Sequence, residues 1–236
     1  KFIQMCAGYY SYKSGHKPVF KGSEDFVGQI IHPQEWNSTI DYENKKVAVI
    51  GSGATAVTLV PQIAKKASHV TMIQRSPTYI ASVPSKYKIL HLLNYISPKF
   101  GYKIIRFTNI LRQRRIYRRA RRSPELVKDY LLGLVRDELP DFDIEKHFTP
   151  SYNPWEQRLC LAPDSDFFES IKQKRVSIET ETIDSFSEKG VQLDSGKLIE
   201  ADIIVTATGI KLQNFGGIRI FVDENEIDIS KSFIYK

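Results

Sequence analysis

A short apolar run followed by closely spaced glycines limits the possible folds of this chain more than any other stretch. Residues 47–50 have the pattern of a buried parallel strand, and Gly51, Gly53 and Ala56 follow with G-x-G-x-x-A spacing. The first glycine permits a tight turn, the second lets a pyrophosphate approach the backbone, and the third small residue lets a helix pack on the strand. A second apolar strand follows at residues 69–75. The pattern predicts a dinucleotide-binding unit, with an accidental glycine-rich turn as the alternative.

The residues that begin the expected helix are the candidates for the phosphate site. The N-terminus of a helix presents unpaired N–H groups and the positive end of the helix dipole, and both attract an anion. The sequence therefore predicts that a dinucleotide pyrophosphate binds along this turn. The candidate cofactor-binding residues are Gly51, Ser52, Gly53, Ala54, Thr55 and Ala56.

The end of the second strand indicates which dinucleotide fits. In NAD and FAD sites an Asp or Glu about 20 residues beyond the glycines bonds the ribose 2′-OH. Here that place holds Arg75, followed by Ser76. A planar guanidinium meets phosphate oxygens in a bidentate manner, and the hydroxyl groups of Ser76 and Thr78 can donate to the same phosphate. We therefore expect NADPH rather than NADH or FAD at this loop, with a solvated surface arginine as the alternative.

Charge is distributed unevenly along the chain. Residues 44–124 hold 17 of the 34 Lys and Arg residues and none of the 27 Asp and Glu residues, although the formal net charge is only +7. Much of this excess of basic residues lies between Arg112 and Arg122. Three apolar residues at helical spacing, Ile104, Phe107 and Leu111, precede this stretch. We interpret this stretch as a cationic amphipathic helix. A solvated face, an electrostatic funnel for a polyanionic cofactor and contact with an anionic membrane stay open, and nucleic acid is the least favoured partner.

Length and composition describe a chain that forms one large or two small domains with a substantial core. It has 236 residues, of which 42% are hydrophobic. No apolar stretch reaches the ~18–20 residues of a membrane helix. The two cysteines, Cys6 and Cys160, provide no metal site and no disulfide framework. We expect both thiols to be reduced and buried, which is typical of a cytoplasmic protein.

The remaining patterns alternate between helix and strand. Residues 86–139 are patterned as helices, with breaks at Pro98, Pro124 and Pro140. Residues 1–8 have the pattern of a strand that ends in a glycine turn, and β-rich runs occupy residues 176–178, 183–187, 191–193 and 199–206. The sequence thus predicts an α/β fold, namely a Rossmann-like FAD/NAD(P)-binding fold with a helical insertion at residues 86–147.

Four residues upstream of the glycine-rich turn carry a family resemblance. Phe26, Gly28, His32 and Trp36 have the spacing F-x-G-x-x-x-H-x-x-x-W. This resembles the fingerprint of the Baeyer–Villiger monooxygenases, FAD- and NADPH-dependent enzymes that insert one oxygen atom beside a ketone carbonyl. Related flavin-containing monooxygenases that oxidise nitrogen or sulfur usually end the motif with Phe or Tyr. The family motif continues with Pro or Asp where this chain has Asn37, so both reaction classes stay open.

The resemblance implies roles for residues elsewhere in the chain. The segment from Tyr152 to Arg158 resembles the one that carries the family's active-site arginine, so Arg158 is the candidate catalytic residue. In such enzymes ketones become esters or lactones through a flavin C4a-peroxide, whose negative charge a fixed guanidinium can hold. The turns at residues 6–10 and 207–209 resemble those that connect the FAD and NADPH domains. This adds Thr208 and Gly209 to the cofactor-binding candidates.

Each of these residues also has a purely structural interpretation. Phe26 and Trp36 are expected to be packing anchors, and Gly28 is expected to stand where a Cβ would obstruct the backbone. His32 either adjusts a hydrogen-bond network between domains or is satisfied structurally. The alternative for Arg158 is a structural salt bridge.

The resemblance also implies a domain organisation. Residues 1–40 would be a remnant of the FAD domain and a linker, residues 41–205 the NADPH domain, and residues 206–236 the return linker. The family has a further glycine-rich loop for FAD that this sequence lacks, so we expect an inactive internal fragment of a longer enzyme. Its partners would be a small organic substrate and O₂. The alternatives are an N- or S-oxygenating enzyme, a flavin disulfide reductase, which would need a redox cysteine pair, and a basic binding module for nucleic acid or membrane.

Overall fold

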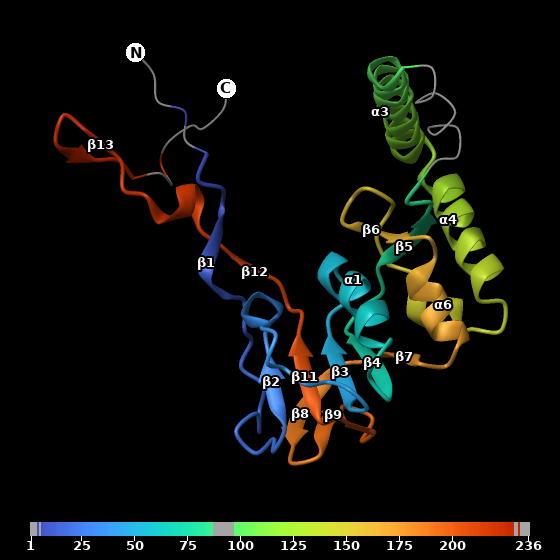
Figure 1. Cartoon of the computed structure of the whole chain (residues 1–236), viewed down its shortest axis with the longest axis vertical. Coiled ribbons are helices and arrows are strands. Elements are labelled where there is room, and N and C mark those ends of the chain that lie inside the picture. Colours follow the sequence, from blue (N-terminus) through green and yellow to red (C-terminus); the bar gives the residue numbers. More distant parts are fainter. Residues whose placement is uncertain (1–3, 5, 87–96, 229–230, 232–236) are drawn as a thin grey trace.

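A five-stranded parallel sheet forms the centre of the protein (Figure 1). The structure, a computed structural model, describes residues 4, 6–86, 97–228 and 231. Neighbouring strands of the sheet are all parallel, in the order β2-β11-β3-β4-β7. The strands are β2 (Gln29–Ile31), β11 (Ile203–Thr206), β3 (Lys46–Ile50), β4 (His69–Gln74) and β7 (Val176–Thr180). The α/β, Rossmann-like fold predicted from the sequence is confirmed.

The central strand β3 is buried on both faces, which explains its uninterrupted apolar run. Val47 and Val49 face the larger core, which includes helix α1 (Ala54–Ile63). Ala48 and Ile50 face a second core on the other side of the sheet. At the start of α1, Ala56 is completely buried. A small residue at this position lets the helix pack closely on the sheet, as the G-x-G-x-x-A spacing predicts.

A helical insertion separates β4 from β7. It begins with β5 (Tyr79–Val83) and returns through β6 (Leu159–Pro163), and these two strands pair in parallel as a sheet of their own. Pro98 and Pro124 stand in the first turn of α3 and α4, where the missing N–H costs nothing, so the predicted breaks are confirmed. The predicted helical positions 87–96 lie outside the described residues. The helices are α3 (Pro98–Arg122), α4 (Pro124–Glu138), α5 (Ile144–Phe148) and α6 (Asp166–Lys172).

A three-stranded antiparallel sheet supports the second core. Its order is β10-β9-β8, with β8 (Ile183–Ser187), β9 (Gly190–Leu193) and β10 (Leu198–Glu200). Phe186 of β8 and Phe26 are buried there against Ile204 of the central sheet. The β-rich run predicted at 199–206 is divided into β10 and β11 at Ala201 and Asp202.

Two described segments near the ends of the chain, at residues 10–15 and 210–212, run side by side away from the central sheet (Figure 1). Strand β1 (Tyr10–Gly15) pairs antiparallel with β12 (Ile210–Leu212). Beyond it lie the 3₁₀ turn η2 (Asn214–Gly217) and the hairpin of β13 (Phe221–Val222) and β14 (Asn225–Glu226). The strand expected at residues 1–8 is not found in its described part, since Gln4 and residues 6–8 have no regular structure.

The fingerprint segment joins the edge of the central sheet. Its strand β2 pairs with β11 from Ile203 to Val205, and the short 3₁₀ helix η1 (Pro33–Glu35) follows. A Cβ on Gly28 would lie 2.1 Å from the backbone oxygen of Asp202. Gly28 is therefore required by the close approach of two backbone segments. The domain boundaries at residues 40/41 and 205/206 stay a prediction, although β2 ties residues 29–31 to the sheet.

Several expectations concern absences and burial. Within residues 6–86 and 97–228, no helix combines the length and apolarity that crossing a membrane requires, and no three His, Cys, Asp or Glu side chains gather as a metal site. Cys160 is buried, as expected, and burial raises the pKa of its thiol. Cys6 is exposed, which corrects the expectation that both thiols are buried. Its thiol is accessible because Cys6 belongs to the segment before β1, which lies outside both cores.

The packing at Gly28 generates a prediction about stability. Gly28→Ala should lower the free energy of unfolding by about 2–3 kcal/mol, because its Cβ would press on the Asp202 carbonyl, which belongs to a backbone that cannot move away cheaply. Gly133→Ala is the matched control, since a Cβ there meets no atom and Gly133 lies inside α4. The free energy of unfolding of this control variant should rise by up to about 1 kcal/mol. Urea unfolding followed by circular dichroism measures both; equal effects would contradict the packing assignment.

Candidate functional site

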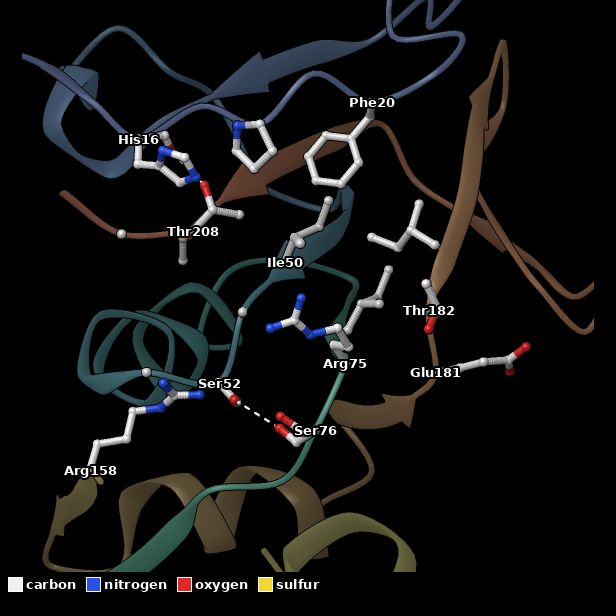
Figure 2. Close-up of a pocket in the computed structure, with 17 residues that line it drawn as sticks. His16, Phe20, Ile50, Ser52, Arg75, Ser76, Arg158, Glu181, Thr182 and Thr208 are labelled. Carbon is white, nitrogen blue, oxygen red and sulfur yellow. Dashed lines mark hydrogen bonds between the residues drawn. The ribbon is translucent and has the colours of Figure 1, made fainter. Parts of the chain in front are cut away.

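A pocket of about 520 Å³ opens where the carboxyl ends of β3, β4, β7 and β11 meet (Figure 2). Ligands of open α/β sheets bind at this end of the strands. Segments far apart in the sequence form its wall, from the loop after β1 to the loop after β11. The lining residues are His16, Pro18, Phe20, Ile50, Gly51, Ser52, Gly53, Ile73, Arg75, Ser76, Arg158, Glu181, Thr182, Ile183, Ala207, Thr208 and Gly209.

The two glycines of the turn after β3 serve different purposes. Gly51 has φ of +128°, and a Cβ on it would lie 2.5 Å from the carbonyl oxygen of Ala207. The fold itself therefore requires Gly51. Gly53 has φ of −80°, and a Cβ on it would meet no protein atom within 4 Å. Protein packing does not explain the glycine at position 53, and the space beside its backbone is open to a ligand.

The N-terminus of α1 opens into this pocket. Its N-cap is Gly53, and no side chain caps the first turn. The first N–H groups of the helix are thus available to an anion, together with the positive end of the helix dipole. Ser52 is buried, and its hydroxyl donates to the backbone oxygen of Ser76 at 3.2 Å. Ser52 consequently ties the glycine-rich turn to the segment after β4, and its side chain is occupied.

Arg75 follows directly after β4 and points into the pocket (Figure 2). Among the described residues its guanidinium has no hydrogen-bond or ion-pair partner. The preceding residue, Gln74, is buried instead and donates to the backbone oxygen of His147 and to the Thr180 hydroxyl, each at 2.8 Å. The anchored Gln74 fixes the backbone from which the exposed Arg75 extends. A free cation in a cleft with an open helix N-terminus is suited to a polyanion.

Arg158 reaches the same pocket from the far end of the helical insertion. Its Nε donates to the Thr78 hydroxyl at 2.9 Å, and its backbone oxygen accepts from the Tyr152 hydroxyl at 3.0 Å. Thr78 is 1% exposed and its hydroxyl also lies 3.5 Å from that of Ser52. Thr78 is thus the buried centre of a network between the glycine-rich turn and Arg158. This network holds the guanidinium by its Nε side and leaves the two Nη atoms facing the pocket (Figure 2).

Two further ionisable groups at the pocket, Glu181 and Tyr79, have partners of their own. Glu181 supplies the acidic side chain of the lining, and its carboxylate accepts a hydrogen bond from the backbone N–H of Ser195. Tyr79 and Tyr152 pack edge to face behind the wall, and the Tyr79 hydroxyl donates to the Tyr152 backbone oxygen at 2.8 Å. Burial raises the pKa of Tyr79 to about 12, so this hydroxyl stays protonated.

The loops beside β1 and β12 form the opposite wall. The backbone N–H of His16 donates to the oxygen of Gly209 at 3.0 Å, and the Thr208 hydroxyl donates to the oxygen of His16 at 2.6 Å. These bonds join the chain entering the sheet to the chain leaving it. Thr208 and Gly209 therefore line the pocket together with the glycine-rich turn, although more than 150 residues separate them in the sequence.

The four fingerprint residues lie outside the pocket lining. His32 is 3% exposed; its Nδ1 accepts from the backbone N–H of Gln34 at 3.2 Å, so its Nε2 donates to the oxygen of Gly209 at 3.0 Å. A Cβ on Gly15 would lie 1.9 Å from the His32 ring. Phe26 belongs to the second core, and Trp36 packs against the larger core. The segment thus supports the pocket through the loops beside β1 and β12.

The structure brings together most of the residues singled out in the sequence. Of the other candidates, Ala54 and Thr55 are exposed at the start of α1 and Ala56 is buried beneath it. Sequence reasoning missed the contributions of His16, Phe20, Glu181 and Thr182. The last two follow β7, and the rule that parallel strands share their carboxyl-end crevice could have identified them. No sequence signal could have found His16 or Phe20, because their place in the pocket lining depends on how the loop after β1 folds against the sheet.

Several known proteins are similar to this chain. The family described as flavin-binding monooxygenase-like matches residues 2–107. The FAD-containing monooxygenase EthA of Mycobacterium tuberculosis is 48% identical over 239 residues, covering 100% of this chain and 49% of EthA. The probable FAD-binding monooxygenase AlmA of Acinetobacter baylyi is 48% identical over 237 residues, covering 100% of this chain and 48% of AlmA. The chain spans about half the length of the curated relatives it matches.

Solved structures share the fold. Cyclohexanone monooxygenase bound to epsilon-caprolactone, in its Loose conformation, superposes with a TM-score of 0.67 and 19% identity, over 89% of this chain and 48% of that one. OTEMO in complex with FAD and NADP superposes with a TM-score of 0.66 and 18% identity, over 88% of this chain and 46% of that one. The similarity shows that these chains share the same overall fold.

The network around Thr78 generates a prediction about ligand binding. Thr78→Val should weaken the binding of NADP⁺ roughly threefold to tenfold, because Arg158 loses the acceptor that fixes its Nε. Thr78→Ser keeps the hydroxyl and should retain the original affinity. Isothermal titration calorimetry on the folded variants measures both. Equal weakening by Val and Ser would show that shape at position 78, rather than the hydrogen bond, is what matters.

Proposed function

We propose that this chain belongs to the flavin monooxygenase family and forms the NADPH-binding part of an FAD- and NADPH-dependent monooxygenase. Its substrates are small organic molecules and O₂. The single observation that carries the proposal is the unpaired Arg75 guanidinium beside the open N-terminus of α1. Both relatives described above have a flavin in their names, and OTEMO was solved with FAD and NADP.

The pocket fits a phosphorylated nicotinamide dinucleotide in three respects. The pyrophosphate lies against Gly53, where no side chain occupies the space beside the backbone. The N–H groups at the start of α1 bond its oxygens. Arg75 and Ser76 bind the 2′-phosphate of the adenosine ribose. FAD does not fit this loop, because Arg75 stands where an FAD site has an acidic residue for the ribose hydroxyl.

Arg158 is the residue we assign to the chemical step. FAD, when bound, supplies the activation of O₂, which amino-acid side chains do not perform. The contribution of Arg158 is a charge that never loses its proton and that Thr78 holds in place. Its free Nη atoms stabilise negative charge on the reacting oxygen atoms, and they also hold the nicotinamide in position. Because the guanidinium is already fixed in place, the surrounding groups need not reorient when negative charge develops during the reaction.

Baeyer–Villiger oxidation of a ketone to an ester or lactone is the reaction we favour. Trp36 closes the fingerprint in the form that the resemblance associates with this class, and the Trp36 side chain is packed against the larger core beside Tyr42. Oxygenation of nitrogen or sulfur is the second candidate, supported by Asn37, which departs from the family motif.

The coenzyme assignment predicts a reversal of preference. Arg75→Glu should weaken NADP⁺ binding about 10- to 100-fold, because a charge-assisted contact is replaced by repulsion. NAD⁺ binding should hold or improve, because a carboxylate can accept from the ribose 2′-OH. Lys66→Glu is the control, with the same change of charge at an exposed position outside the pocket. The assignment fails if calorimetric titration finds the same NADP⁺-to-NAD⁺ ratio in Arg75→Glu as in the unchanged protein.

The reaction class is tested with the full-length protein loaded with FAD. We expect NADPH- and O₂-dependent conversion of ketones into esters or lactones, identified by mass spectrometry, with amines and sulfides as the comparison panel. Arg158→Met should lower kcat for ketones at least about 100-fold, as expected for loss of a fixed charge at the reacting atoms. Products from the amine or sulfide panel alone would instead establish N- or S-oxygenation.

A further inference from the structure

Helix α3 carries a concentration of positive charge that the nucleotide pocket does not use. It is 25 residues long and packs mainly on α4, and Gly101 and Ala120 are its buried residues. Figure 1 shows it at the edge of the molecule, beyond α4. It contains no acidic residue. Its basic residues are Lys99, Lys103, Arg106, Arg112, Arg114, Arg115, Arg118, Arg119, Arg121 and Arg122.

Apolar side chains share the outward side of α3 with this charge. Phe100, Ile104, Phe107 and Leu111 follow one another at intervals of four, three and four residues, which places them on one stripe of the helix. Phe100 is 56% and Phe107 62% exposed. The buried Ala120 lies on the other side of the helix. Two phenylalanine rings in water are unfavourable unless another surface covers them.

The same stripe continues into the arginines. Arg114, Arg118 and Arg122 extend the spacing from Leu111 towards the end of the helix. All three are exposed, and they form no ion pair with any residue in the described ranges. The outward side of α3 is therefore divided lengthwise: its first half presents aromatic and aliphatic groups, and its second half presents unneutralised guanidinium groups.

We propose that α3 docks on an anionic membrane surface and lies in its plane. The half with Phe100 and Phe107 enters the boundary between headgroups and acyl chains, and Arg114, Arg118 and Arg122 bind lipid phosphates. A helix of this kind binds through buried apolar area and attraction to anionic headgroups together. The surface is separate from the nucleotide pocket, since no residue of α3 lines that pocket.

A nucleic acid would satisfy the arginines but not the rest of the stripe. Phosphate neutralisation needs only cations, and base stacking uses flat side chains. Ile104 lies between the two rings, and Leu111 lies between Phe107 and Arg114 on the same stripe; neither aliphatic side chain has a use in either kind of contact. Acyl chains and headgroups together match both halves of the helix.

Vesicle co-sedimentation of the full-length protein tests the proposal. Binding to phosphatidylcholine vesicles that contain phosphatidylserine should be at least about tenfold tighter than to phosphatidylcholine alone, and added salt should weaken it. The combined variant Arg114→Gln, Arg118→Gln and Arg122→Gln should lose this advantage. The charge-matched control changes Lys65, Lys66 and Lys189 to Gln, at exposed positions away from α3, and should bind as the unchanged protein does.

The phenylalanines separate the membrane from other anionic partners. Phe100→Ser with Phe107→Ser should weaken vesicle binding at least about fivefold while leaving NADP⁺ affinity and the circular dichroism spectrum unchanged. Fluorescence anisotropy with a duplex DNA oligonucleotide is the comparison. Tighter binding to the duplex than to the vesicles, dependent on the arginines and indifferent to the phenylalanines, overturns the proposal in favour of nucleic acid. Failure of the unchanged protein to sediment with anionic vesicles overturns it outright.

Discussion

The contact between the turn after β3 and the end of β11 is the constraint on which the rest of the site depends. Gly51 lies so close to the Ala207 carbonyl that a single added carbon would stand 2.5 Å from it. This closeness brings the loop of Thr208 and Gly209 over the glycine-rich turn and closes one side of the pocket. The helix N-terminus, Arg75 and Arg158 acquire a common opening only because these two strand ends meet.

Positive charge has two separate arrangements in this chain. Arg75 and Arg158 are single cations, one extending from an anchored backbone and the other fixed through Thr78, and each faces a pocket. Helix α3 instead repeats its charge along an exposed surface. Isolated, oriented cations recognise a particular group on a small molecule, whereas repeated charges recognise an extended anionic surface. A net charge of +7 alone would not distinguish these uses.

Local sequence patterns predicted the elements whose causes are local. The apolar run before Gly51 and the prolines at positions 98 and 124 identified a strand and two helix starts, because burial and the missing proline N–H act within a few residues. Thr78 as the centre of a network and His16 in the pocket wall could not be predicted. Their roles depend on which distant segment folds against them, namely the Arg158 loop and the turn at Gly209. The division between β10 and β11 also depends on tertiary structure, since the two strands belong to different sheets.

The contact of Gly15 with His32 has a mechanical consequence. The imidazole fills the space that a side chain at position 15 would take, and the same ring holds the Gly209 carbonyl. The two-stranded ribbon of β1 and β12 is thus fastened to the fingerprint segment at its root. Both strands of the ribbon are therefore linked, through one imidazole ring, to the segment that forms the edge of the parallel sheet.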